Sequence, residues 1–145
     1  MRSLVWLAPL LVGAVPVQPI ASGQNLCKVA PLSAIRHAAG QQYRPGIAAN
    51  GMCTWERPDL RAGLTVSTHP RAQGLLLMRQ FVARGARRIA VPGASRAVLV
   101  DMAGQAGKDL FVAYPQVVVQ VNMTAPRPVA EARLLAVAKL VAAKA

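Results

Sequence analysis

Apolar residues recur along this chain at two different spacings, and each spacing predicts one kind of secondary structure. Over Pro31–Ala39 the apolar residues fall three to four positions apart, which is the period of a helix with one buried stripe. Proline suits the first turn of this helix, and Gly40 follows it as a stop signal. The same spacing predicts a second helix over Gly74 to about Arg84 and a final helix from Pro128 almost to the C-terminus.

Other segments alternate apolar and polar residues, which is the pattern of a strand with one buried face. Leu64 and Val66, for example, alternate with Thr65 and Ser67. Strands are expected over Ile47–Glu56, Leu60–Thr68, Arg87–Val91, Ala97–Asp101, Leu110–Tyr114 and Val117–Met123.

The order of these elements predicts the fold class. A helix, two strands, a helix, several strands and a final helix follow one another with short connections. Short connections favour antiparallel neighbours, so we expect an antiparallel sheet backed by helices, in the α+β class. In the last strand Val118, Gln120 and Asn122 share one face, so that face of the sheet is expected to be only partly buried.

The amino-acid composition gives the chain a strong positive charge. The chain has 145 residues, a length suited to one domain, and a formal net charge of +12. Apolar residues make up 54% and charged residues 15%, which excludes a wholly disordered chain.

The first residues have the pattern of a secretory signal peptide. Arg2 precedes an apolar run over Leu4–Val15, and the small residues Ala21 and Gly23 stand at the −3 and −1 positions of a cleavage site before Gln24. We therefore expect a signal peptide over residues 1–23 and a single α+β domain over residues 24–145. The mature chain is expected to be periplasmic or secreted, with no transmembrane segment.

Other interpretations of this segment remain open. Cleavage after Ala14 is an alternative, although Pro16 follows closely. An uncleaved anchor would need about 20 apolar residues, whereas this run has only about a dozen. Lipid attachment at Cys27 is not expected, because Leu26 stands where a small residue is required.

Export determines how the two cysteines are interpreted. Cys27 and Cys53 both lie beyond the expected cleavage site, in a compartment where thiols oxidise, so we expect them to form a disulfide. Trp55 shares a strand face with Cys53, so the indole is expected to cover the disulfide in the core. The alternative is a reactive or metal-binding thiol, but there is no C-x-x-C motif, and neither His37 nor His69 has a spacing that suggests a site.

The sequence carries no recognisable catalytic motif. Glu56 and Asp59 lie at a turn, and Asp101 and Asp109 flank a loop, which is typical of turn chemistry rather than of paired catalytic acids. No nucleophile-elbow glycines surround a serine, and the loop 104–108 lacks the pattern of a phosphate-binding loop. We expect no catalytic, cofactor-binding or metal-binding residues, and no enzyme. The candidates for a serine nucleophile and its base are Ser33, Ser67, Ser95, His37 and His69.

A group of arginines is the remaining candidate site. Arg84, Arg87 and Arg88 lie around the end of the second helix, with Arg79 before them. Arg71 and Arg96 are expected near. This cluster is a candidate for binding an anionic envelope surface or an acidic ligand. A merely solvated basic face is the alternative. Nucleic acid is not expected as a partner, because the protein is exported and has few aromatic residues for base stacking.

Short motifs spread over nearly the whole mature chain carry a resemblance to a known family. These motifs are Cys27, Ala38-Ala39-Gly40, Cys53-Thr54-Trp55, Gly63–Val66, Leu75–Ala83, Gly85–Ile89, Gly93, Ala97, Leu110–Val112 and Val117–Val121. On these residues the chain resembles a family of small secreted and lipoprotein-type domains of unknown function, which also occur as extracytoplasmic sensor-like domains of receptor-type kinases. The resemblance implies a fold and a location, and it assigns no catalytic residues. This chain lacks the lipid-attachment cysteine of that family.

Together these features predict an exported, non-catalytic protein for binding, sensing or envelope association, without a cofactor. The alternative is a small periplasmic enzyme or enzyme inhibitor with a site that the sequence does not reveal. A shallow concavity rimmed by arginine would favour the binding protein. A deep pocket with perturbed titratable groups would favour the enzyme.

Overall fold

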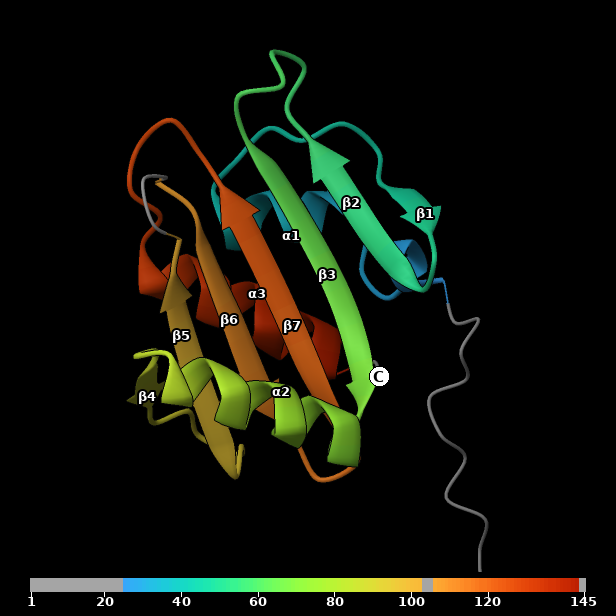
Figure 1. The fold of residues 1–145 in the computed structure, drawn as a ribbon. Helices are drawn as coiled ribbons and strands as arrows, with labels where there is room; N and C mark the ends of the chain where they lie inside the picture. The colour runs from blue at the N-terminus through green and yellow to red at the C-terminus, as the bar shows by residue number, and fades with distance from the viewer. Residues whose placement is uncertain (1–24, 103–105, 144–145) are drawn as a thin grey trace, which may run out of the picture.

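The computed structural model describes residues 25–102 and 106–143, and its centre is a seven-stranded antiparallel sheet (Figure 1). The strands lie in the order β1-β2-β3-β7-β6-β5-β4. The predicted signal peptide over residues 1–23 lies outside the described residues. The strands are β1 (Ile47–Ala49), β2 (Met52–Glu56), β3 (Gly63–Pro70), β4 (Arg87–Ile89), β5 (Arg96–Asp101), β6 (Lys108–Ala113) and β7 (Val117–Thr124).

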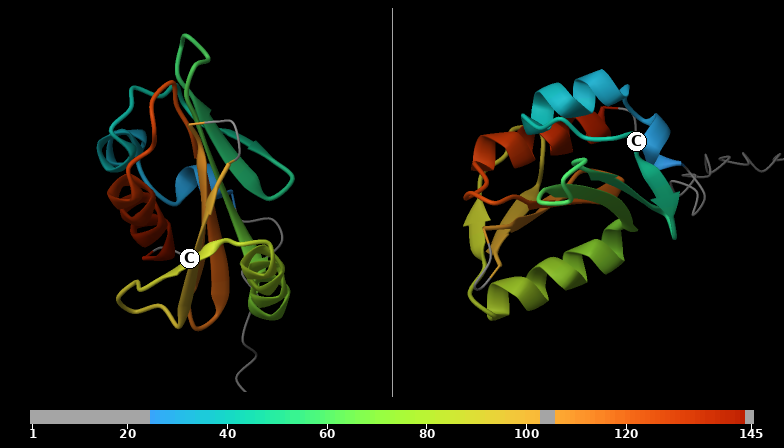
Figure 2. Two further views of the ribbon diagram at one scale, coloured as in Figure 1. Left: turned by 60° about the vertical axis from the view of Figure 1, so that its left-hand side comes forward. Right: turned by 90° about the horizontal axis from the view of Figure 1, so that it is seen from above.

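Helices cover both faces of this sheet. The helices α1 (Leu32–Ala39) and α3 (Glu131–Ala142) pack on one face, and α2 (Arg71–Ala83) packs on the other (Figure 2). A short 3₁₀ helix, η1 (Leu26–Lys28), precedes α1 and contacts β1 and β2. The predicted α+β class, with an antiparallel sheet backed by helices, is therefore confirmed.

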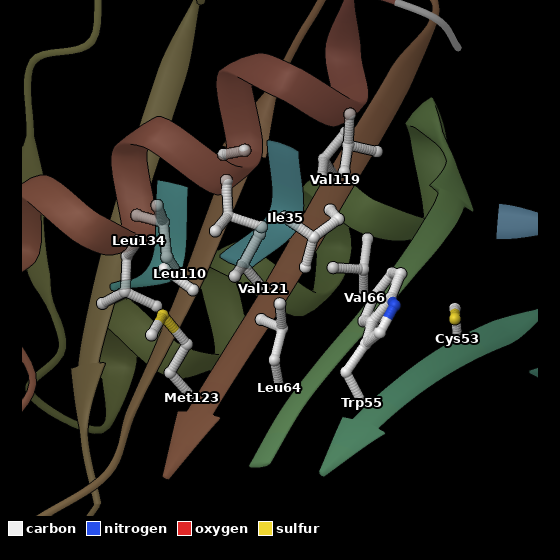
Figure 3. Close-up of a cluster of buried hydrophobic side chains, with 14 of the residues drawn as sticks. Ile35, Cys53, Trp55, Leu64, Val66, Leu110, Val119, Val121, Met123 and Leu134 are labelled. Atoms are coloured by element: carbon white, nitrogen blue, oxygen red, sulfur yellow. The ribbon is translucent and has the colours of Figure 1, made fainter. Parts of the chain in front are cut away.

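The larger core lies between the sheet and the helices α1 and α3. Alternate residues of the strands point into it, and the apolar stripes of both helices close it (Figure 3). Full burial of this many large apolar side chains is the main source of stability for a fold of this size. Its fully buried members include Ile35, Trp55, Leu64, Val66, Leu110, Val119, Val121, Met123 and Leu134.

A smaller core lies between the sheet and α2. Met78 of α2 packs against Val98 and Phe111 of the sheet, and Phe81 stacks against Phe111 at 5.0 Å between ring centroids. Helix α2 crosses only one end of this face, and in the described part of the chain no helix covers the other end (Figure 1). One face of the sheet is thus only partly buried, as the alternation in β7 predicts.

The disulfide between Cys27 and Cys53 is present, with 5.1 Å between the two Cα atoms. It ties η1 to β2. Cys53 and Trp55 are both buried on the same face, as predicted. The chain at Gly46 passes over both, because a Cβ there would lie 2.5 Å from the Cys53 sulfur and 2.6 Å from the Trp55 Nε1.

The prediction of one strand over Ile47–Glu56 is wrong. The pair Asn50-Gly51 adopts left-handed conformations, with φ of 52° and 73°, and turns the segment into the β1–β2 hairpin. This dipeptide is a strong hairpin signal that outweighs the apolar run around it. The next strand begins at Gly63 rather than Leu60, because Leu60 lies in the preceding turn with a φ of 58°.

Within the described residues, no helix has the length and apolar character needed to cross a membrane.

Candidate anion-binding site

A hollow of about 390 Å³ lies between α2 and the strands β4 and β5. We call it the basic pocket. Its floor contains the buried side chains of Met78 and Val98, and its rim carries exposed arginines. The basic pocket is lined by Met78, Arg79, Val82, Arg88, Ile89, Ser95, Arg96, Ala97 and Val98.

Helix periodicity and strand alternation together build this pocket. Met78 and Val82 are four residues apart on α2, so both turn towards the sheet, while Arg79 lies beside them at the rim. Arg88 of β4 pairs with Val98 of β5, which places the arginine on the face that packs against α2. Arg96 is two residues from Val98 and therefore shares that face.

The pocket is strongly positive. Three arginines line it, and no aspartate or glutamate is among its lining residues. Charges of one sign around a concave surface with apolar walls reinforce one another's potential. At the margin, Arg71 donates to the Ser95 hydroxyl at 3.2 Å and to the Tyr114 carbonyl at 2.6 Å, which holds a further guanidinium beside the lining residue Ser95.

The structure separates the three arginines of the sequence-predicted cluster. Arg88 lines the basic pocket. Arg87 lies on the opposite face of β4, because it pairs with Leu99 of the larger core, and it forms an ion pair with Glu131 of α3. Arg84 caps α2 and is exposed, but it is not among the lining residues.

Arg79 and Arg96 complete the pocket instead of Arg84 and Arg87. Arg79 is five residues before Arg84, and the turn of α2 carries it to the rim. Arg96 joins Arg88 only through the register of β4 against β5, in which Ile89 pairs with Ala97. Strand register depends on the loop between the two strands, so the sequence places Arg96 near the cluster without assigning it to the pocket.

A second polar feature lies on the same sheet face, beyond α2. Gln120 of β7 is its centre: the Gln120 Oε1 atom accepts from the Ser67 hydroxyl at 3.2 Å and contacts the His69 Nε2 atom at 2.8 Å. The Gln120 amide donates to both carboxylate oxygens of Asp109, at 3.0 and 3.2 Å. Burial raises the pKa of Asp109 to about 6, against the lowering effect of the Gln120 hydrogen bonds.

This network does not assemble a serine nucleophile with its base. Ser67 and His69 both bond to the Gln120 Oε1 atom, and among the described residues neither Ser67 with His69 nor His69 with Asp109 forms a hydrogen bond. His37, the other histidine, is exposed on α1. Among the described residues no three histidine, cysteine, aspartate or glutamate side chains gather as a metal site.

Comparison of the chain with models of known protein families, with curated proteins and with solved structures finds no match. The resemblance to small secreted domains therefore stays a prediction from the quoted residues.

Proposed function

We propose that this protein is an exported, non-catalytic binding protein that takes an anionic amphiphile into the basic pocket. Through such a ligand it would associate with an anionic envelope surface. The observation that carries the proposal is the combination of a buried apolar floor with three arginines at the rim and no lining acid.

The ligand class follows from the apolar floor and the arginine rim of the basic pocket. Guanidinium groups pair with phosphate or carboxylate oxygens through several parallel hydrogen bonds. Val82 is partly exposed beside the buried side chains of Met78 and Val98 and offers apolar contact to a hydrocarbon chain. A small inorganic anion would use only the rim, and a neutral lipid would use only the floor, so an amphiphile with a negative head fits best.

Export is supported by two independent features. The N-terminal residues have the pattern of a signal peptide, and the Cys27–Cys53 disulfide is typical of oxidising compartments. An enzyme or enzyme inhibitor stays the alternative. The raised pKa of Asp109 is the feature that favours an enzyme. The feature that argues against one is that Ser67 and His69 both bond to Gln120 and, among the described residues, not to each other.

The proposal is tested by titrating the protein with dodecyl phosphate below its micelle concentration, using calorimetry. Dodecyl maltoside has the same hydrocarbon chain with a neutral head and serves as the control ligand. We expect dodecyl phosphate to bind at least about tenfold more tightly and to weaken as salt rises. Replacing Val82 with asparagine should also weaken it. Equal binding of the two ligands, or no binding of dodecyl phosphate, would contradict the proposal.

A further inference from the structure

A second hollow, of about 450 Å³, lies at the other end of the sheet. We call it the arginine pocket. It adjoins the end of β7 at Met123, whereas the basic pocket adjoins Arg96 at the start of β5, beside the beginning of β7. The arginine pocket is lined by Ala39, Gly40, Gln41, Arg57, Met123, Ala125, Pro126, Arg127, Pro128, Val129, Ala130 and Arg133.

Three arginines from three separate segments meet at this hollow. Arg57 follows β2, Arg127 lies in the connection between β7 and α3, and Arg133 belongs to the first turns of α3. No acidic side chain is among the lining residues. The Asp59 carboxylate compensates the charge of Arg57, whereas no ion pair among the described residues compensates Arg127 or Arg133. An anion bound at the hollow would relieve the repulsion between these charges.

Two of these guanidinium groups are held in place by the protein. Arg57 donates to the Gln41 Oε1 atom at 3.3 Å and to the Asp59 carboxylate at 2.5 Å, and Arg133 donates to the His37 carbonyl at 3.2 Å. Each guanidinium has five N–H donors, so several remain for a ligand. Because the two guanidinium groups are already held in place, ligand binding costs less side-chain conformational entropy.

The backbone around Arg133 is shaped to admit its guanidinium. Gly40 ends α1 with a φ of 68°, and a Cβ at this position would lie 2.8 Å from the Arg133 Cζ atom. A glycine there allows the guanidinium to lie against the chain. Ala130, the N-cap of α3, also lines the pocket, but Glu131 in the first turn opposes the positive end of the helix dipole, so the positive field of the pocket comes from its arginines.

We propose that the arginine pocket is a second anion site, which takes a small phosphate-bearing solute or headgroup. Three guanidinium groups around a hollow suit the several oxygens of a phosphoryl group, because each can bind two of them. Its lining contains three buried apolar side chains, Ala39, Met123 and Val129, and the guanidinium groups around them favour a compact polar ligand. This inference does not depend on ligand binding at the basic pocket.

The test is a calorimetric titration of the full mature chain with inorganic pyrophosphate at low salt. Arg127 makes no side-chain hydrogen bond within the described residues, so Arg127→Gln leaves the surrounding structure intact. We expect R127Q and R133Q each to weaken pyrophosphate binding about tenfold. Arg61→Gln is the matched control, because Arg61 is exposed and does not line the pocket.

A second arm distinguishes the source of the phosphate group. If R127Q weakens binding to phosphatidic acid vesicles as well as to pyrophosphate, the site takes a lipid headgroup. If it weakens only pyrophosphate binding, the site takes a soluble phosphate compound. The proposal is overturned if the wild-type protein does not bind pyrophosphate, or if R61Q loses as much affinity as R127Q and R133Q.

Discussion

Arg87 and Arg88 are neighbours in the sequence, but their side chains lie on opposite faces of β4. Arg87 forms an ion pair with Glu131 on the face that carries α3, and Arg88 lines the basic pocket on the face that carries α2. The hydrogen bond and the charge of Glu131 raise the pKa of the Arg87 guanidinium. The two arginines therefore have different environments, although a count of charges along the chain treats them alike.

The disulfide should contribute substantially to stability. Cys27 and Cys53 are 26 residues apart, so their bond constrains the unfolded chain. We expect the double variant C27S/C53S to lose about 3–4 kcal/mol of unfolding free energy, measured by urea denaturation. Reduction of the wild-type protein should lower stability by a similar amount and leave C27S/C53S unchanged. A reductant-insensitive wild-type protein with both thiols alkylated would show that the bond is absent in solution.

Helix α2 depends on a glycine for its approach to the sheet. A Cβ at Gly74 would overlap the Val118 side chain, so Gly74→Ala should destabilise the protein by about 1–3 kcal/mol. At an exposed helical position with no neighbouring atoms, a Gly→Ala change would stabilise a protein by about 1 kcal/mol. A loss of stability in G74A would therefore indicate the overlap with Val118. Gln73→Ala, at an exposed neighbouring position, is the control and should be close to neutral.

The double variant G74A/V118A checks the mechanism of this effect. Removing the Val118 methyl groups makes room for the new Cβ, so the double variant should be more stable than the sum of the two single changes predicts, by about 0.5–3 kcal/mol. Simple additivity in urea denaturation would mean that the two residues do not compete for the same space.

Asp109 should give the protein a stability that falls as pH rises. Its pKa is about 6 when folded, against an ordinary value of 3.8. Between about pH 4 and pH 6 the folded chain holds a proton that the unfolded chain has lost, so stability decreases with rising pH across this window. Asp109→Asn removes this dependence and should raise stability at neutral pH by up to about 3 kcal/mol.

Asp101→Asn provides the control for that experiment. A hydrogen bond from Lys108 lowers the pKa of Asp101, so its contribution to stability is present at neutral pH and is lost as pH falls. The two variants should therefore change the pH profile in opposite directions. If D109N leaves the slope of the wild-type profile between about pH 4 and pH 6 intact, Asp109 does not titrate there.

Much of the fold was predictable from local patterns. Alternation in Leu64–Val66 and in β7 predicted the face of the larger core, because each strand has apolar residues on one side. Ser67 is buried as well, although it lies on the other face. The helices were predicted because their apolar residues repeat at the helical period. The hairpin at Asn50-Gly51 is not predicted by the apolar run, because the turn depends on two left-handed residues inside that run.

The candidate site was predictable only in part. The sequence indicated an arginine cluster that included Arg88, but the members of the pocket depend on the pairing of β4 with β5 and on the packing of α2. The arginine pocket was not predicted at all. Arg57 and Arg133 are far apart in the sequence, and only the tertiary fold brings both to one hollow.

The comparison of two single variants tests the central claim, that the basic pocket binds anionic amphiphiles. Arg87→Gln and Arg88→Gln remove the same charge one residue apart, so binding to phosphatidylglycerol vesicles separates the effect of the pocket from that of net charge. We predict that R88Q weakens binding about tenfold and does not make binding more sensitive to salt. The affinity of R87Q should stay within about twofold of that of the wild-type protein. Equal losses in R87Q and R88Q would contradict the account, because the charge would then act as a diffuse coat and not through the pocket.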